Sequence, residues 1–299
     1  MLRESTVAGL ESCGLDPGAV EAVAAAALRE DLAYGPDVTT EAVVDEASRS
    51  SGAFVVRGSG VLAGVLVAAA VCEVASDGAV TVEVLVEDGT TVRPGLAVAT
   101  VDGPTWPLLR AERSALNLLC HLSGVATATR RWVDVLAGTA AVVRDTRKTT
   151  PGLRVLEKYA VRCGGGVNHR MGLGDAALVK DNHVAATGSV AAALDAVRRA
   201  APEVVVEVEC DTLAQVEEAL ASGADLILLD NMDLATTRRA VGLARARGGV
   251  RLEASGGLSL ENAAAVAATG VDYLAVGALT HSAPILDIGL DLEGADAPV

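Results

Sequence analysis

The sequence predicts an α/β protein whose second half is a barrel, and three observations support this prediction. Near residue 140 the pattern changes, and short apolar runs then alternate with Ala-rich stretches of helical composition. Each run ends at or near a polar or small residue. Strands that alternate with helices in this way are typical of parallel βαβ units with buried strands. The runs are 140–145, 176–181, 204–210, 225–230, 250–256 and 272–278.

Six or seven strand–helix units favour an α/β barrel, which need not be complete. The alternative is an open doubly wound sheet. It is less favoured because neither G-x-G-x-x-G nor a P-loop follows the first run.

The chain begins with a helix signal at Asp16-Pro17, where Asp is a good N-cap and Pro suits the first helical position. The apolar run 20–28 continues this helix, and EDLAYGPDVTT (30–40) ends it in a loop.

Residues 50–104 form short Val-rich runs separated by glycines, which predicts a compact β module. Asp88-Gly89 and Pro94-Gly95 are turn signals within it. The pattern is similar to the hairpin fold of biotin and lipoyl carriers, a non-enzymatic alternative. Those carriers are modified on a lysine, and no lysine precedes Lys148 in this chain. We therefore expect a structural lid or a dimer surface.

A long helix is predicted from Trp106 to Ala137, with its leucines approximating one apolar face. Arg113 lies near its start. On spacing alone, Arg113 is equally well explained as a surface residue paired with a neighbouring acid.

Polar or small residues stand at or near the carboxyl ends of the six predicted strands. Since catalytic groups converge at that rim in α/β barrels, we expect these residues to surround an active site. A single strand-end acid can equally be a helix N-cap, but six such positions in succession favour a site. They are Arg144, Lys180, Glu209, Asp230, Ser255 and Gly277.

The window 144–183 is cationic in an acidic chain of net charge −15. It holds eight Lys and Arg against four Asp and Glu, and we expect His169 and His183 to be able to add to this charge. Arginine forks match carboxylate and phosphate oxygens, so the window predicts a pocket for a polyanion. For Arg154, Lys158 and Arg162, the favoured reading is a solvated helix with salt bridges.

Composition excludes several classes of protein. One Phe, two Trp and three Tyr are too few for a base-stacking platform, and the acidic balance argues against a nucleic-acid surface. Five scattered cysteines without C-x-x-C spacing predict reduced thiols in a cytoplasmic protein. We expect neither a signal peptide nor a membrane span.

The rim offers three chemical zones that together predict a barrel enzyme acting on a phosphosugar. The cations of the window suit a dicarboxylate or a carboxylate with a diphosphate. Glu209 and Asp230 suit ribose hydroxyls, Mg²⁺ or developing positive charge. Gly-rich turns at 255–257 and 277–278, before predicted helices, suit a phosphate monoester.

The run RDTRKTTPGLRVLEKYAVRCGGGVNHRMGLGDAALVKDNH (144–183) closely resembles the quinolinate phosphoribosyltransferases, also called carboxylating nicotinate-nucleotide pyrophosphorylases. The resemblance covers nearly the whole chain in the family's order. Further matching segments are EDLAYGPDVTT (30–40), ERSALNLLCHLSGVAT (112–127), VEVECDTL (206–213), LILLDNM (226–232), EASGGL (253–258) and VGALTHS (276–282).

This resemblance implies conversion of quinolinate and phosphoribosyl pyrophosphate into nicotinate mononucleotide, pyrophosphate and CO₂, with Mg²⁺, in NAD biosynthesis. It implies an α/β sandwich domain over 1–113, joined by the tail 281–299, and an incomplete, seven-stranded α/β barrel over 114–280. It also implies a cytoplasmic homodimer with active sites shared between subunits, and leaves larger assemblies open.

The resemblance also implies roles for individual residues. Catalytic roles fall on Lys148, Lys180, Glu209 and Asp230, and the last two are the implied Mg²⁺ ligands. Arg113 is expected to reach the site of the neighbouring subunit. The residues implied to bind substrates are Arg113, Thr146, Arg147, Lys148, His169, Arg170, Lys180, Glu209, Asp230, Ser255, Gly256, Gly257, Val276, Gly277 and Ala278.

Two other enzyme classes are alternatives. The first is a class I aldolase with a Schiff base on Lys180 or Lys148. The second is a paralogue of the same fold, found with molybdate transport genes, that has lost the pyridine substrate. The complete RDTRKT and GGGxNHR motifs argue against this paralogue.

Overall fold

The computed structural model describes residues 1–293, and residues 294–299 of the expected tail lie outside the described residues. The chain forms two compact units. The first comprises Met1–Ala128, Thr150–Gly165 and the described residues from Ser282 onward, and the second comprises Thr129–Thr149 and Gly166–His281. The first segment of the first unit thus ends at Ala128, whereas the resemblance implies a domain boundary after residue 113.

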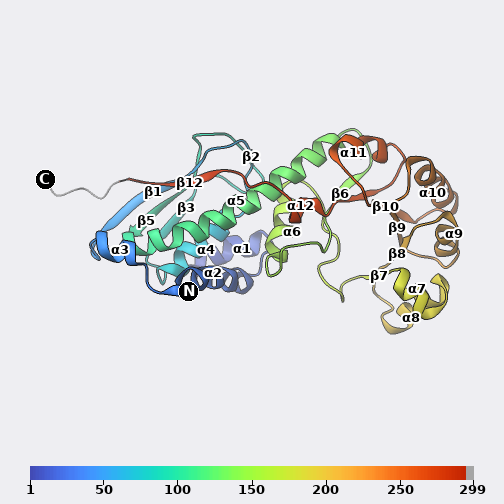
Figure 1. Ribbon diagram of the computed structural model, residues 1–299, viewed down its shortest axis with the longest axis horizontal. Helices are drawn as coiled ribbons and strands as arrows, with labels where there is room; N and C mark the ends of the chain where they lie inside the picture. Colours follow the sequence, from blue (N-terminus) through green and yellow to red (C-terminus); the bar gives the residue numbers. More distant parts are fainter. Residues whose placement is uncertain (294–299) are drawn as a thin grey trace. The chain divides into compact units, whose positions relative to one another are not determined.

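The first unit is built on an antiparallel sheet with the strand order β12-β1-β5-β3 (Figure 1). The central strand β1 pairs with β5 on one side and with β12, from the other end of the chain, on the other. The strands are β1 (Arg49–Val56), β3 (Thr81–Val84), β5 (Ala97–Pro104) and β12 (Ile288–Glu293), and a separate pair is formed by β2 (Gly60–Val61) and β4 (Thr91–Val92).

Helix α4 (Val65–Ala75) departs from the all-β reading of residues 50–104, which is wrong for this segment. The run is rich in Ala, the best helix former, and nearly all of it is buried. Its N-terminus is capped from outside the helix. The carboxylate of Asp88 accepts hydrogen bonds from the backbone N–H of Gly64 (2.7 Å) and of Val65 (3.2 Å). This distant cap cannot be read from the local sequence.

Two further helix predictions are confirmed. Asp16 caps α2 (Pro17–Asp31) by accepting from Gly18 N and Ala19 N. The long helix is α5 (Thr105–Val135), within two residues of its expected ends. The remaining helices of this unit are α1 (Glu4–Ser12), the short 3₁₀ turn Leu32–Tyr34, α3 (Val38–Val43) and α6 (Arg154–Cys163).

The expectation of a solvated helix is wrong for part of α6. Lys158 is 1% exposed and Glu157 is fully buried. Glu157 accepts hydrogen bonds from the backbone N–H of Thr150 (3.0 Å) and pairs with His121 Nε2 (2.8 Å). The helix therefore turns charged side chains into the protein, where a charge is tolerated only with polar partners.

The second unit contains a parallel sheet with the order β6-β11-β10-β9-β8-β7. All six expected strand runs are found in it. An isolated parallel bridge between Arg144 and Val167 continues the pairing beyond β6 at the position of a seventh strand. The strands are β6 (Val142–Arg144), β7 (Ala177–Val179), β8 (Val206–Cys210), β9 (Leu226–Asp230), β10 (Arg251–Ser255) and β11 (Tyr273–Ala275).

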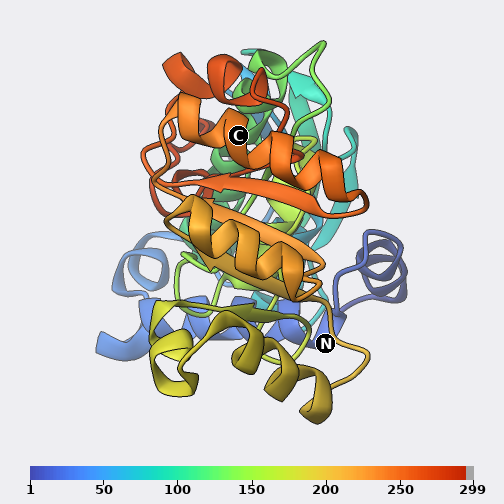
Figure 2. The same cartoon turned by 90° about the vertical axis from the view of Figure 1, so that its right-hand side faces the viewer.

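The helices that alternate with these strands lie over one face of the parallel sheet, as the yellow-to-orange helices in front of the strands show (Figure 2). This confirms the α/β class, with an antiparallel sheet in the first unit and a parallel sheet in the second. The helices are α7 (Asp181–Thr187), α8 (Val190–Ala200), α9 (Leu213–Ala221), α10 (Leu234–Arg247), α11 (Leu260–Ala267) and the short α12 (Ala278–His281).

Within residues 1–293, no helix has the length and apolar character that crossing a membrane requires. All five cysteines are free thiols, and three of them are buried.

Candidate active site

A pocket of about 430 Å³ opens in the second unit where the parallel strands end. It brings together side chains that are far apart in the sequence. Its lining residues are Thr146, Arg147, Lys148, His169, Arg170, Leu178, Lys180, Glu209, Leu228, Asp230, Glu253, Ser255 and Ala275.

Three strands, β7, β9 and β10, each supply a pair of lining residues two positions apart, because alternate residues of a strand face the same side. The outer member of each pair stands at or just beyond the strand end, and the inner member lies deeper. The inner residues Leu178, Leu228 and Ala275 are apolar, whereas Glu253 is a fully buried acid. The pocket thus has a polar mouth and a partly apolar floor.

Arg147 and Arg170 form the cationic wall of the pocket. Burial, and then the positive charge of Arg147, lowers the pKa of the Arg170 guanidinium. The Nε atom of Arg147 is buried without a hydrogen-bond partner among the described residues. Two desolvated guanidinium groups that repel one another are stabilised by an anion with more than one carboxylate.

A short turn holds Arg170 in place. The Nη1 atom of Arg170 donates to the carbonyl oxygen of Ala176 (3.1 Å), and Asp175 accepts from the backbone N–H of Met171 (2.6 Å) and of Gly172 (2.8 Å). Burial opposes ionisation of Asp175, but these N–H groups hold the pKa of its carboxyl group below the usual range. The arginine is therefore preorganised by its own loop.

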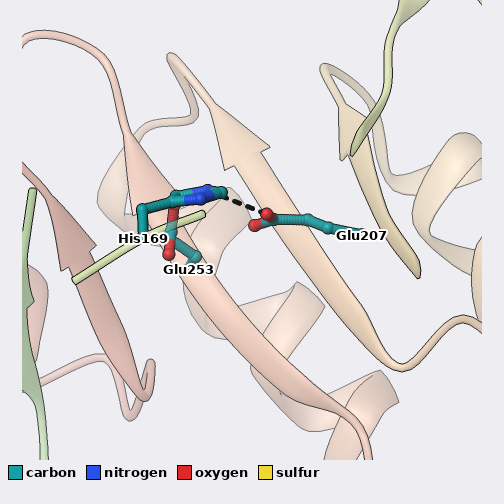
Figure 3. A group of neighbouring side chains, drawn as sticks. All are labelled: His169, Glu207 and Glu253. Carbon is teal, nitrogen blue, oxygen red and sulfur yellow. Dashed lines mark ion pairs between the residues drawn. The ribbon is translucent and has the colours of Figure 1, made fainter. Parts of the chain in front are cut away.

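His169 lies in a buried cluster with two glutamates (Figure 3). Its Nε2 atom is 2.9 Å from Oε2 of Glu207 and 3.5 Å from Oε1 of Glu253. Glu253 is also paired with Arg144 (2.7 Å). The three residues come from the segment after α6, from β8 and from β10, so the cluster ties the pocket wall to the sheet.

The hydrogen bonds of His169 fix its proton on Nε2. The backbone N–H of Arg170 donates to Nδ1 (2.7 Å), so Nδ1 is an acceptor and Nε2–H points to Glu207. His183 behaves similarly, since its Nδ1 accepts from Lys180 N (2.9 Å). A metal on Nε2 of His169 would require the other tautomer.

Glu207 and Glu253 are site residues that sequence reasoning missed. Burial, and then repulsion by Glu207, raises the pKa of Glu253 to about 7. One carboxylate oxygen of each lacks a hydrogen-bond partner among the described residues. The available signal was their spacing: each lies two residues before a strand-end residue, Glu209 or Ser255, and so faces the same way.

Glu209 and Asp230 stand at the ends of neighbouring strands β8 and β9. Lys180 Nζ forms an ion pair with Glu209 Oε2. Asp230 Oδ2 accepts from Asn231 Nδ2 (2.7 Å). Two carboxylates beside one pocket offer the hard oxygen ligands that Mg²⁺ prefers, so the donor set fits that ion.

The two Gly-rich turns lie at the ends of β10 and just beyond β11. Gly256 and Gly257 both have positive φ angles, of 85° and 60°. Near the second turn, Thr280 Oγ1 donates to the carbonyl oxygen of Lys148 (2.9 Å). A Cβ atom on Gly277 would lie 3.0 Å from Cδ of Lys148, so the turn and the lysine stem are close.

Arg113 is not part of this lining. It belongs to the first unit, where it is exposed on α5 and lines a different pocket, of about 280 Å³, with Asp31 and Arg110. Ser114, the next residue, donates to Asp31 (3.0 Å).

Comparisons with known proteins show the family of the chain. The model for "Quinolinate phosphoribosyl transferase, C-terminal domain" matches residues 125–291, and that for the N-terminal domain matches residues 37–123. A carboxylating nicotinate-nucleotide pyrophosphorylase of Mycobacterium leprae is 58% identical over 268 residues, which cover 89% of this chain and 94% of that protein. A probable counterpart from Bacillus subtilis is 48% identical over 207 residues, covering 69% and 71%.

Two solved structures have the same fold. NadC from Streptococcus pyogenes superimposes with a TM-score of 0.87 at 41% identity, covering 93% of this chain and 98% of that one. The nicotinate-nucleotide pyrophosphorylase from Francisella tularensis gives a TM-score of 0.88 at 34% identity, covering 93% and 98%. With both domain models matched in order and relatives this similar across most of its length, the chain belongs to the quinolinate phosphoribosyltransferase family.

Proposed function

We propose that the pocket of the second unit is the site of a decarboxylating phosphoribosyl transfer from phosphoribosyl pyrophosphate to quinolinate. The product, nicotinate mononucleotide, feeds NAD biosynthesis, and this activity is that of the family. The observation that supports the site is the lining itself, which brings the cations Arg147, Lys148 and Arg170 together with Glu209, Asp230 and Ser255 around about 430 Å³. Ser255 is the first residue of one Gly-rich turn; the glycines of both turns lie beside the pocket and are not part of its lining. This lining suits a dianionic acid beside a phosphorylated sugar.

Arg147 and Arg170 take the two carboxylates of quinolinate, with Thr146 and Lys148 beside them. The mutual repulsion of the two guanidinium groups is relieved when a dianion binds between them. His169 acts through Arg170, because its Nδ1 accepts a hydrogen bond from the backbone N–H of Arg170. The Nε2 atom of His169 is paired with the carboxylate of Glu207.

Glu209 and Asp230 face the ribose. As pyrophosphate leaves, positive charge develops at the sugar carbon, and fixed carboxylates stabilise that charge without reorganising. Lys180 meets the departing pyrophosphate, which requires it to exchange the carboxylate of Glu209 for phosphate oxygens. Glu209 and Asp230 would also hold Mg²⁺, which when bound neutralises charge on the diphosphate.

The 5′-phosphate lies against the backbone of Ser255–Gly257 and of Val276–Ala278. Left-handed glycines allow the backbone to approach an anion closely, because no Cβ stands in the way. Turns of this kind late in a barrel are common phosphate sites.

Decarboxylation needs little further chemistry from the protein. Once the ring nitrogen carries the ribose, the ring is a pyridinium, and loss of the C2 carboxylate as CO₂ leaves the electron pair of the broken bond on C2. The adjacent positive charge stabilises this carbanion, which then takes a proton from water to give the C2–H of the product. The protein then has to position and desolvate that carboxylate, and the apolar floor of Leu178, Leu228 and Ala275 is suited to this task.

Arg113 completes the site from the neighbouring subunit of a homodimer in this proposal. Its exposure and its place outside the main pocket are compatible with contact to a second chain. The five free cysteines support a reducing, cytoplasmic setting.

The test is to mix the purified protein with quinolinate, phosphoribosyl pyrophosphate and Mg²⁺ and to follow nicotinate mononucleotide by absorbance and by chromatography. Product that requires all three components is the expected result. Turnover with nicotinate but not with quinolinate would overturn the dicarboxylate assignment. Absence of turnover with any pyridine acid would overturn the function.

Variants then test the site. Arg147→Ala and Arg170→Ala should each lower kcat/KM by about 10²-fold or more, the usual effect of losing one preorganised charge-stabilising group. Arg238→Ala is the matched control, since Arg238 is exposed on α10 of the same unit. A kcat/KM within threefold of wild type for Arg147→Ala would contradict the carboxylate site.

A further inference from the structure

Asn231, immediately after β9, has an unusual backbone conformation. Its φ angle is 52°, and the other non-glycine residue with a positive φ among the described residues is Asp77, in the turn after α4. Asn tolerates the left-handed region better than most residues, but strained conformations persist mainly where the surroundings hold them in place. This conformation beside the pocket therefore calls for a structural reason.

The reason is that Asn231 contacts two parts of the pocket at once. Its Nδ2 donates to Oδ2 of Asp230 at 2.7 Å, and its backbone N–H donates to the carbonyl oxygen of Ser255 at 2.9 Å. Asp230 and Ser255 are register partners on β9 and β10, and both line the pocket. The residue thus joins a strand-end carboxylate to the start of a Gly-rich turn.

The side chain of Asn231 also packs directly on that turn. A Cβ atom on Gly256 would overlap Oδ1 of Asn231 and would lie 3.0 Å from its backbone nitrogen. The amide therefore occupies the space that a side chain at position 256 would take. On its other side the turn is held by Asn262, whose Nδ2 donates to the carbonyl oxygen of Gly257 at 2.9 Å.

We propose that Asn231 is a positioning residue that fixes the carboxylate of Asp230 relative to the Ser255–Gly257 turn. It thereby sets the spacing between the group that meets the ribose hydroxyls and the group that meets the 5′-phosphate. This inference rests on the proposed function, because the spacing that Asn231 sets belongs to the part of the site that binds the phosphoribosyl group. The pyridine half, on Arg147 and Arg170, does not depend on it.

The first test uses Asn231→Gly and Asn231→Asp. Glycine adopts the left-handed conformation without strain, so this variant removes only the amide. Aspartate keeps the shape of the side chain but replaces its donor with an acceptor that faces Asp230. Both should raise the KM for phosphoribosyl pyrophosphate about tenfold, the scale of one hydrogen bond to a charged group, and leave the KM for quinolinate within about twofold.

The second test uses the two glycines of the turn. Gly256→Ala and Gly257→Ala both place a side chain at a positive φ, but a Cβ on Gly257 meets nothing within 4 Å. The loss caused by Gly256→Ala should be smaller in the Asn231→Gly background, because the overlapping amide is gone. The loss caused by Gly257→Ala should be the same in both backgrounds, so Gly257 is the matched control for strain.

The outcomes separate this inference from the proposed function. Wild-type protein that does not form nicotinate mononucleotide would overturn the function itself. Active wild type together with an unchanged KM for phosphoribosyl pyrophosphate in both Asn231 variants would overturn only the positioning role. A parallel rise in both KM values with a lowered Tm would also overturn it, because a general structural defect predicts that pattern.

Discussion

Lys180, just after β7, and Glu209 on β8 form an ion pair in which each side chain neutralises the charge of the other. The lysine side chain is 44% exposed and the glutamate side chain 16%. Lys180, which we propose binds the diphosphate, and Glu209, which we propose binds the ribose, are thus paired with each other. In the proposed function, substrate binding separates them, and each then takes a substrate group of opposite charge or polarity.

This pairing predicts non-additive kinetics. Glu209→Gln and Lys180→Met should each lower kcat/KM by about 10²-fold, as expected when a preorganised electrostatic contact is lost. The double variant should lose less than the product of the two, because each single change leaves an unbalanced charge in the pocket. Steady-state kinetics on the four proteins measure this, and strictly multiplicative losses would contradict the pairing.

The buried carboxyl group of Glu253 predicts a pH-dependent stability. Burial and Glu207 raise its pKa from 4.5 to about 7, so between these values the folded state holds a proton that the unfolded state has lost. Its contribution to stability is full below about pH 4.5 and is lost as the pH rises through about 7. Glu253→Gln removes this titration.

Relative to wild type, Glu253→Gln should therefore gain up to about 3 kcal/mol of unfolding free energy between pH 4.5 and 8, as the raised pKa implies. Urea unfolding at several pH values measures the difference. Glu217→Gln, at an exposed position on α9, is the matched control and should show no such trend. A difference that is constant with pH would contradict the raised pKa.

Because Asp88 caps α4, we expect its removal to lower the free energy of unfolding more than removal of a single one of its hydrogen bonds. Asp88→Ala leaves the N–H groups of Gly64 and Val65 and the hydroxyl of Tyr159 without their acceptor, and should cost about 2–4 kcal/mol. Tyr159→Phe removes only one hydrogen bond, of 2.7 Å, and should cost about 1 kcal/mol. Thermal unfolding ranks the two, and equal costs would argue against the cap.

Two helical glycines predict opposite effects of the same substitution. Gly124 of α5 lies against the tail, and a Cβ atom there would overlap the carbonyl oxygen of Pro284. Gly124→Ala should destabilise the protein by about 1–3 kcal/mol, the usual range for overpacking. Gly242 of α10 has open space, so Gly242→Ala should stabilise by about 0.5–1 kcal/mol. Destabilisation by both would contradict the role of the tail contact. Urea unfolding of both variants provides the measurement.

The elements with strong local signals could be predicted from the sequence. Asp16-Pro17 starts α2 because both residues act within one turn. The six apolar runs from 140 onward are strands that pair in one parallel sheet, and their alternation with helical stretches signals this arrangement locally. Helix α4 could not be predicted, since its apolar run fits a strand or a helix equally and its cap comes from Asp88, more than twenty residues later.

Site residues could be predicted from the sequence where their position in a strand determines which end of the sheet their side chains reach. Lys180, Glu209, Asp230 and Ser255 meet at one pocket because parallel strands end at one rim. The pairings within the pocket were not predictable. Whether Lys180 contacts Glu209, or His169 uses Nδ1 as an acceptor, depends on rotamers and on the backbone of neighbouring strands, which periodicity does not specify.

The pairing of β12 with β1 has a consequence for the order of folding. Strand β1 is complete by residue 56, yet its partner on one side ends at residue 293. On the ribosome, β1 exposes an open sheet edge until nearly the whole chain has been made, and such edges invite pairing with other chains. The second unit consists of residues 129–149 and 166–281, so all of it has been made before β12. We therefore expect the second unit to be able to fold earlier than the antiparallel sheet. Nascent chains arrested before residue 288 should therefore remain protease-sensitive in β1 while the parallel sheet is already protected.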